Sequence, residues 1–167
     1  MSTSFNWKSM RPFLKQALLE DAAWNDRTSK AVISTSSRAR GEVIAKGDGV
    51  LAGLPLLKEV YALLDKRCRV KLLHKEGTAV RPGMKVAILE GPAQPLLSGE
   101  RVSLNLLSRL SGVATLTKKF AKVLPKGKLY DIRKTTPLLR PLERYAVRVG
   151  GGTNHRYNLA GHVLIKD

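Results

Sequence analysis

The chain has very little cysteine, few aromatic residues and no long apolar run. Cys68 is the only cysteine among 167 residues, which excludes an internal disulfide framework and any cysteine-based zinc site. Aromatic residues make up 5% of the chain, without the stacking platform of an RNA reader. No segment approaches the ~20 apolar residues that a membrane span requires. We therefore expect a cytoplasmic protein without a membrane partner, in which Cys68 is a structural thiol.

Acidic residues are also scarce. The chain has 13 Asp and Glu against 30 Lys and Arg, which gives a formal net charge of +17. This excess favours polyanionic partners: nucleic acid, acidic membrane, or phosphorylated and carboxylated metabolites. The hydrophobic content of 43% is enough for a real core, so the chain is not a disordered tail.

The first ~100 residues show the mixed periodicity of an α+β domain. Apolar residues at helical spacing predict helices over 11–23 and 55–64, and Ser98 is expected to begin the longest helix. Short apolar runs between turn residues predict strands over 31–33, 41–45, 70–73 and 84–89.

From residue 128 the pattern changes to strand, helix, loop and strand, which is typical of a β/α unit with parallel strands. We expect strands over 129–132 and 162–165. The helix lies near 138–149, with Thr136 as a cap and Pro137 in its first turn, or it begins at Pro141 instead.

Cations follow both of these predicted strands. If Arg133, Lys134, Arg156 and Lys166 lie within a few ångströms, each pair repels by ~1 kcal/mol in water and ~4 kcal/mol in a partly shielded site. A fold keeps such a cluster only where something negative neutralises it. Arg grips a carboxylate or phosphate with paired hydrogen bonds, and Lys supplies a compact charge. The sequence thus predicts a pocket for a substrate with several anionic groups; the alternative is a set of solvated surface cations.

The glycine run 150–152 has two interpretations. Glycine at this point ends a helix by relieving the cost of a left-handed backbone. The same glycines could also expose backbone amides to an anion beside Asn154, His155 and Arg156.

In combination these motifs resemble the quinolinate phosphoribosyltransferase family, also called nicotinate-nucleotide pyrophosphorylase (carboxylating), of NAD biosynthesis. The segments 20–29, 49–54, 90–93 and 99–117 match it in order and spacing, although each is weak alone. The specific series is Arg133-Lys134-Thr135-Thr136-Pro137, Gly150-Gly151-Gly152, Asn154-His155-Arg156 and Leu164-Ile165-Lys166-Asp167. Relatives linked to molybdate transport rank second, because they usually lack the Leu-Ile-Lys-Asp ending.

The resemblance implies an α+β N-terminal domain over 1–108, including a long connecting helix, followed over 109–167 by the start of a truncated α/β-barrel domain. It implies a transferase that joins quinolinate to phosphoribosyl pyrophosphate with Mg²⁺, releasing pyrophosphate and carbon dioxide and leaving nicotinate mononucleotide.

The resemblance also assigns roles to single residues. Lys134 and Lys166 are the expected catalytic residues, and no residue is expected to hold a metal. The expected substrate-binding residues are Arg101, Ile132, Arg133, Lys134, His155, Arg156 and Lys166. In the family, Arg101 enters the active site of the neighbouring subunit, which implies a homodimer or a larger homo-oligomer.

Several positions depart from the family pattern. Ile132 stands where the family normally has a substrate-contacting threonine, and Leu138 replaces a usual glycine; Pro141, Asn158 and Gly161 also differ. Length departs further: residues 109–167 give 167 − 109 + 1 = 59 residues, whereas a β/α barrel takes ~250. The acidic residues that help bind Mg²⁺ and the ribose hydroxyls in relatives lie further along their chains.

Other readings stay open. The chain could be an inactive fragment or remnant of that enzyme. It could also be a basic nucleic-acid-binding module, supported by cations outside the predicted pocket at Arg38, Arg40, Lys66, Arg67, Arg69 and Lys71. We expect nucleic acid to be the weaker alternative, because a basic run is more often a solvated face.

Overall fold

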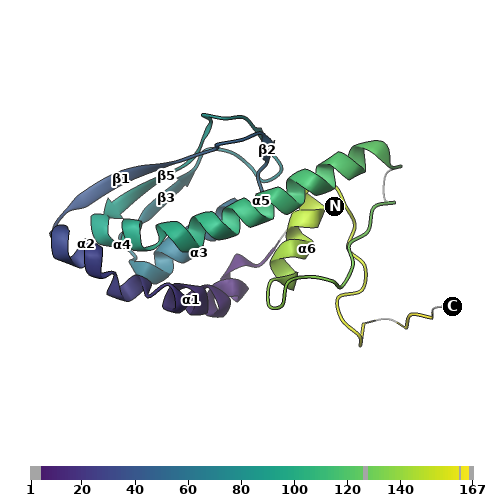
Figure 1. Ribbon diagram of the computed structural model, residues 1–167, viewed down its shortest axis with the longest axis horizontal. Helices are drawn as coiled ribbons and strands as arrows, with labels where there is room; N and C mark the ends of the chain where they lie inside the picture. Colours follow the sequence, from purple (N-terminus) through teal and green to yellow (C-terminus); the bar gives the residue numbers. More distant parts are fainter. Residues whose placement is uncertain (1–4, 126–127, 162, 166–167) are drawn as a thin grey trace.

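The structure is a computed structural model that describes residues 5–125, 128–161 and 163–165 (Figure 1). Its elements follow the order η1 (Trp7–Met10), α1 (Arg11–Glu20), η2 (Ala23–Asn25), α2 (Arg27–Val32), β1 (Arg38–Ile44), β2 (Gly49–Val50), α3 (Leu54–Leu64), β3 (Arg69–Leu72), β4 (Ala79–Val80), β5 (Lys85–Pro92), α4 (Ala93–Ser98), α5 (Glu100–Val123) and α6 (Arg140–Val149).

An antiparallel sheet of order β1-β5-β3 is the base of the N-terminal part, and β2 pairs with β4 beside it. The helices lie on one face of the sheet (Figure 1). The other face is charged, because the strand register aligns Arg40, Glu90 and Arg69 in one cross-strand row. Val43 and Leu89 are buried. One apolar and one polar face are typical of an antiparallel sheet packed on one side, and the predicted α+β character is confirmed.

Helix α3 joins the two halves of the core. Its buried Leu56 and Val60 pack with α1, α5 and α6 residues, whereas Leu57 and Tyr61 pack with residues of the sheet. Full burial of each such side chain contributes about 1.5–3 kcal/mol. The leucine stripe predicted over 55–64 is therefore confirmed as core, and it explains why the helix forms at this place.

The long helix α5 is fixed to β2 by side-chain hydrogen bonds to backbone. Thr115 Oγ1 accepts the N–H of Val50 at 2.8 Å, and Ser111 Oγ accepts that of Ala52 at 3.2 Å. Gly53, which follows, has φ +97°, and a Cβ there would lie 2.7 Å from a Leu110 methyl. These contacts give a packing reason for the weak motifs at 49–54 and 109–117.

Two expectations in the N-terminal part were wrong. The predicted strand over 31–33 is the end of α2 and the residue after it, because Asp26 caps a helix: its Oδ1 accepts the Ser29 N–H at 3.0 Å. The longest helix begins at Glu100, since Ser98 ends α4 and donates its hydroxyl to Gln94 O at 3.0 Å.

The strands predicted after residue 128 do not form regular strands in the described part of the chain. Instead of a strand over 129–132 there is one parallel bridge between Tyr130 and Thr153. Residues 163–165 form no strand with the described part of the chain, and His162 lies outside it. Helix α6 begins at Arg140 with Pro141 in its first turn, so the later of the two predicted starts is confirmed. Thr136 does not cap it.

The glycine run ends α6 and lets it approach α5 closely. A Cβ on Gly150 would lie 2.5 Å from the Ala114 carbonyl oxygen and 2.6 Å from Thr117 Cβ. Gly151 has φ +97°. The amides of Gly150, Gly151 and Gly152 donate to carbonyls of α6 at 2.9, 3.0 and 2.9 Å. The helix-ending interpretation is confirmed. The anion-binding interpretation of these amides is wrong, because their hydrogens are already used.

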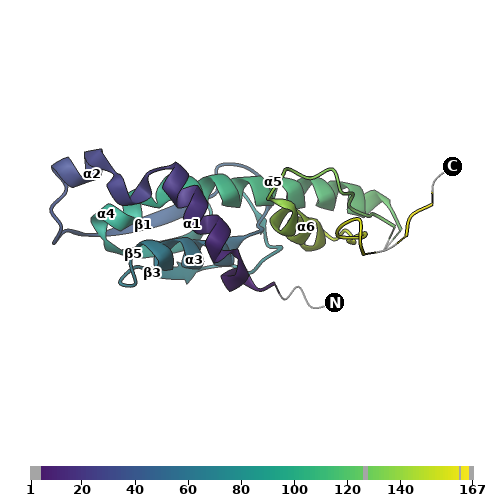
Figure 2. The same cartoon turned by 90° about the horizontal axis from the view of Figure 1, so that it is seen from below.

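Figure 2 shows α6 beside the C-terminal half of α5, at the opposite end of the molecule from α2 and α4. No helix in the described residues is long and apolar enough to cross a membrane.

We predict opposite effects of alanine at two glycines that contact or belong to α5. Gly150→Ala should lower the free energy of unfolding by about 1–3 kcal/mol, because the methyl group meets rigid backbone. Gly112→Ala should raise it by about 0.5–1 kcal/mol, since a Cβ at this helical position meets nothing within 4 Å. Urea denaturation followed by circular dichroism measures both. Equal stabilities of the two variants would contradict the close-approach account.

Candidate anion-binding site

A parallel bridge brings two cationic loops together. The Asp131 N–H donates to Thr153 O at 2.9 Å, and the Thr153 N–H donates to Leu129 O at 2.7 Å. We call residues 131–136 the first loop and 153–157 the second loop. Both leave the bridge in the same direction, as the ends of parallel strands do. The arrangement places Arg133 and Lys134 on one segment alongside His155 and Arg156 on the other.

The carboxylate of Asp131 ties the two loops. Oδ1 accepts the backbone N–H of His155 at 2.6 Å, and Oδ2 accepts the side-chain amide of Asn154 at 2.7 Å. The side chain of Asp131 is only 5% exposed. A buried carboxylate needs such donors, since an unpaired one is costly in a low-dielectric interior. Asp131 is thus a structural anion inside a cationic region.

Arg144 of α6 donates hydrogen bonds to the backbone of the second loop. Its Nη2 donates to His155 O at 2.6 Å and its Nη1 to Arg156 O at 3.1 Å. The same Nη1 lies 3.4 Å from the carboxylate of Asp131, and the Arg144 side chain is 12% exposed. Its guanidinium also lies over the Tyr157 ring, 5.3 Å from the centroid. One cation therefore contacts three consecutive residues of the second loop.

The first turn of α6 holds the first loop. Glu143 accepts the backbone N–H of Thr136 at 3.2 Å and the Nε of Arg109, on α5, at 3.0 Å. Arg140 Nε donates to the hydroxyl of Thr135 at 3.1 Å. Burial acts to raise the pKa of Glu143, but the hydrogen bonds from Arg109 and Thr136 outweigh it and hold this pKa below the ordinary value. Glu143 is therefore ionised at neutral pH.

The predicted substrate-binding side chains differ in exposure. Arg133 is half-buried, and its Nε is buried without an acceptor in the described part of the chain. Lys134 and His155 are exposed, as is Ile132 at 60%. Lys134 has no hydrogen-bonding or ion-pair partner among the described residues. The structure brings Arg133, Lys134, His155 and Arg156 into one region, whereas Lys166 lies outside the described residues.

Arg101 is not part of this region. It lies in the first turn of α5, whereas α6 packs near Ala114, 13 residues further along the helix. At a rise of 1.5 Å per residue this separation is about 20 Å. The Arg101 side chain is 66% exposed and lies 3.7 Å from Glu100. Among the described residues, Arg101 pairs with its neighbour Glu100 and makes no contact with either loop.

Sequence reasoning missed the residues that hold the loops in place. Asp131, Arg140, Glu143 and Arg144 received no role, although a signal existed. Arg140, Arg144 and Arg148 repeat every four residues on a predicted helix and so share one face. An acidic residue at the start of the first loop of a strongly basic chain is a second signal.

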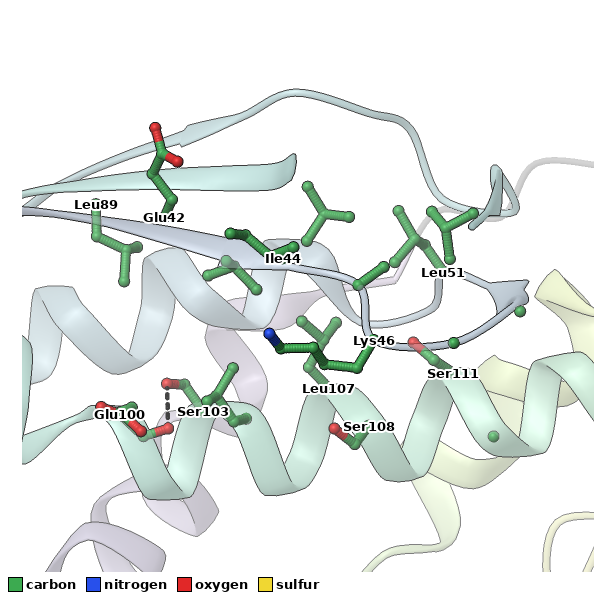
Figure 3. Close-up of a pocket in the computed structure, with 18 of the residues that line it drawn as sticks. Glu42, Ile44, Lys46, Leu51, Leu89, Glu100, Ser103, Leu107, Ser108 and Ser111 are labelled. Atoms are coloured by element: carbon green, nitrogen blue, oxygen red, sulfur yellow. Dashed lines mark hydrogen bonds between the residues drawn. The ribbon is translucent and has the colours of Figure 1, made fainter. Parts of the chain in front are cut away.

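A separate groove of about 920 Å³ lies between β1 and α5 (Figure 3). Apolar side chains such as Leu51 and Leu107 line it, and Lys46 extends along the space between the two elements. Glu100 adds an acidic group to its lining, whereas the carboxylate of Glu42 points away from α5 (Figure 3) and lies 2.9 Å from Nζ of Lys85. None of the predicted substrate-binding residues lines this groove, and sequence patterns gave no sign of it.

Two further sequence interpretations can be compared with the structure. Burial raises the pKa of the Cys68 thiol to about 11, so it is protonated at neutral pH and suits a structural role. Some of the cations that supported nucleic-acid binding are neutralised by neighbours: Arg40 lies 3.2 Å from Glu90, and Arg67 lies 2.7 Å from Asp65. Their charge is therefore less available to a polyanion.

We predict that Glu143→Gln destabilises the fold by about 1–2 kcal/mol at pH 7, because Arg109 loses a charged acceptor while remaining partly hydrated. The folded-state pKa of Glu143 is lowered, so its stabilisation is complete above the ordinary value of 4.5. This stabilisation is lost as pH falls through the folded-state pKa. Denaturation of wild type and variant across pH should show a difference that shrinks below pH 4.5. Glu20→Gln, at an exposed carboxylate of α1, is the control; an equal loss there would contradict the prediction.

Two family models together match most of the chain. The model of the quinolinate phosphoribosyl transferase N-terminal domain matches residues 26–111, and that of the C-terminal domain matches residues 113–167. The chain is 44% identical over 164 residues to a probable nicotinate-nucleotide pyrophosphorylase (carboxylating) of Bacillus subtilis, covering 97% of this chain and 56% of the relative. It is 40% identical to the Synechocystis protein of the same name, covering 96% of this chain and 55% of the relative.

Solved structures give the same result. NadC from Streptococcus pyogenes superposes with a TM-score of 0.91 at 39% identity, over 95% of this chain and 57% of the other. The nicotinate-nucleotide pyrophosphorylase from Francisella tularensis does so with a TM-score of 0.86 at 32% identity, over 95% and 57%. The chain thus spans about half the length of the curated relatives it matches. With both family domains matched in order and the fold shared, this chain belongs to the quinolinate phosphoribosyltransferase family.

Proposed function

We propose that this chain acts in quinolinate phosphoribosyl transfer, which forms nicotinate mononucleotide, carbon dioxide and pyrophosphate from quinolinate and phosphoribosyl pyrophosphate. The observation that carries the proposal is the pair of cationic loops anchored on α6, with a buried Arg133 Nε that has no acceptor in the described part of the chain. A buried N–H without an acceptor costs about 1–3 kcal/mol, which an anion placed at this point would recover.

Substrate charge agrees with the site. Quinolinate has two carboxylates, and the donor has a 5-phosphate and a pyrophosphate, so several cations are needed. Arg133, His155 and Arg156 are proposed to hold the quinolinate carboxylates and adjoining phosphates. Lys134, exposed on the first loop, is proposed to lie near the reacting groups. Lys166 is proposed as a second catalytic cation on the family resemblance.

The reaction exchanges bonds in sequence. The pyridine nitrogen forms a bond to the anomeric ribose carbon while the bond from that carbon to the pyrophosphate oxygen breaks, and pyrophosphate leaves with the electron pair. The sugar gains oxocarbenium character, so cations must gather the departing charge and not approach the ring. The pyridinium nitrogen then stabilises the electron pair left when the neighbouring carboxylate departs as carbon dioxide, and that carbon takes a proton.

Magnesium is proposed only as a companion of the donor's phosphates. Over 5–125, 128–161 and 163–165, no group of three His, Cys, Asp or Glu side chains could hold a metal ion. The carboxylate of Asp131, which joins the two loops, already accepts hydrogen bonds from Asn154 and His155. The described residues therefore do not fit a magnesium held by protein side chains, and we assign the ion no step.

A homodimer, or a larger homo-oligomer, is proposed to complete the site. Arg101 lies about 20 Å along α5 from the segment that packs against α6 and is exposed at its own end. If it contacts substrate as the family resemblance implies, it must do so in another subunit. A cytoplasmic location is proposed because Cys68 is the only cysteine, so the chain has no internal disulfide.

We predict that Arg133→Met weakens quinolinate binding at least about tenfold, because a charged hydrogen bond contributes about 1.5–3 kcal/mol. Isothermal titration of the chain with quinolinate, at two salt concentrations, measures this. Arg81→Met removes the same charge from an exposed position after β4 and is the control. Binding that is salt-sensitive and equally reduced in both variants would reject the proposal and favour non-specific attraction of anions.

We predict that Ile132→Thr strengthens quinolinate binding by about two- to tenfold, since the hydroxyl restores a donor worth about 0.5–1.5 kcal/mol. Ile132 is 60% exposed, so the substitution removes little packing. Ile132→Val matches threonine in shape without the hydroxyl and should leave the affinity at the wild-type value. A titration in which threonine gives no gain over valine would argue against a substrate contact at this position.

A further inference from the structure

The backbone at His155 and Arg156 is held by hydrogen bonds from two buried side chains. Asp131 accepts the N–H of His155, and Arg144 donates to the carbonyl oxygens of His155 and Arg156. The side chains of these two residues leave the same short segment. Their directions are therefore fixed by backbone hydrogen bonds, and those bonds come from residues outside the second loop.

The same two side chains connect the second loop to the first. Asp131 precedes Arg133 by two positions, and its carboxylate lies 3.4 Å from Nη1 of Arg144. Asn154 adds a cross-link, since its amide donates to Asp131 at 2.7 Å and to the carbonyl of Arg144 at 3.0 Å. A shift of either loop would break several of these bonds at once. These bonds therefore fix the spacing between the first loop, which carries Arg133, and the second loop, which carries His155.

Neither side chain is placed to touch a substrate. Asp131 and Arg144 are 5% and 12% exposed, and the donors of Arg144 point to backbone oxygens and to Asp131. The pair is neutral overall, so Arg144 adds no net repulsion to the exposed cations nearby. Arg140 and Arg148 lie one turn away on either side along α6. Arg148 lies over the Tyr145 ring, and among the described residues it makes no contact with either loop.

We propose that Asp131 and Arg144 are positioning residues that hold the two loops at the separation needed to grip two adjacent carboxylates together. The proposal rests on quinolinate being the ligand of these loops. A single carboxylate needs only one loop, whereas adjacent carboxylates need both in register. Binding geometry of this kind has to be held within about 0.5 Å, and a misplacement of about 1 Å can cost a hundredfold.

The test compares Arg144→Met with Arg148→Met, which removes the same charge from the same helix. Hydrogen exchange of the His155 amide, read by nuclear magnetic resonance, should accelerate at least roughly tenfold in Arg144→Met and stay unchanged in Arg148→Met. Quinolinate affinity should fall roughly ten- to a hundredfold in Arg144→Met. Affinity for nicotinate, which has one carboxylate, should change by less than about threefold, because one loop suffices for it.

A conservative variant keeps the proposal testable if Arg144→Met unfolds the region around the loops. Arg144→Lys retains charge and several N–H donors, so slow exchange and the preference for quinolinate over nicotinate should largely return. Unchanged His155 exchange in Arg144→Met, or an equal loss of affinity for both ligands, would overturn the proposal. If exchange responds as expected but the wild-type chain binds no quinolinate, the loops are held as described and quinolinate is rejected as their ligand.

Discussion

The close approach of α6 to α5 is the contact on which the candidate site depends. Gly150 makes it possible, because any side chain there would meet the Ala114 carbonyl. Once α6 lies at this distance, its first turns face the loops before and after it, and Arg140, Glu143 and Arg144 bond to them. The glycine run thus contributes to the site through packing, and its own amides bind no anion.

Buried carboxylates make a strongly cationic region compatible with folding. Asp131 neutralises Arg144, and Glu143 neutralises Arg109. The carboxylate of Glu76 likewise has protein donors and links α6 to the start of α3. It accepts the Tyr145 hydroxyl at 2.6 Å and the N–H groups of Gly53 and Leu54 at 2.7 Å. Burial is the main reason why the pKa of Tyr145 is raised. Arg109 and Arg144 are thus paired with carboxylates inside the fold, whereas Lys134 is exposed and Arg133 is half-buried without an acceptor for its Nε in the described part of the chain.

The sequence predicted the helices that hydrophobic periodicity marks. It missed the structural features that depend on contacts between residues distant in the chain. The leucines of α3 identified a core helix, and the cations after residue 131 pointed to the candidate site. The end of α2 looked like a strand, because the β-branched Val32 and Ile33 outweighed the capping signal of Asp26. The segment 129–132 looked like a strand, but only Tyr130 finds a bridging partner in the described chain. The roles of Asp131 and Arg144 depend on a contact across 13 positions that no local pattern encodes.

Helix α5 relates the sheet to the site. Ser111 and Thr115 lie one turn apart and bond the backbone of the β2 segment, while Ala114 and Thr117 on an adjoining face meet the glycines that end α6. Both contacts fall within the same two turns of one continuous helix, so neither the sheet nor the site loops can turn about the α5 axis without breaking one of them. An exposed group at the start of α5, such as Arg101, is therefore held at a fixed distance from the loops. That rigidity is what a residue would need to serve a site outside its own chain, because its position is set by the fold and not by a flexible linker.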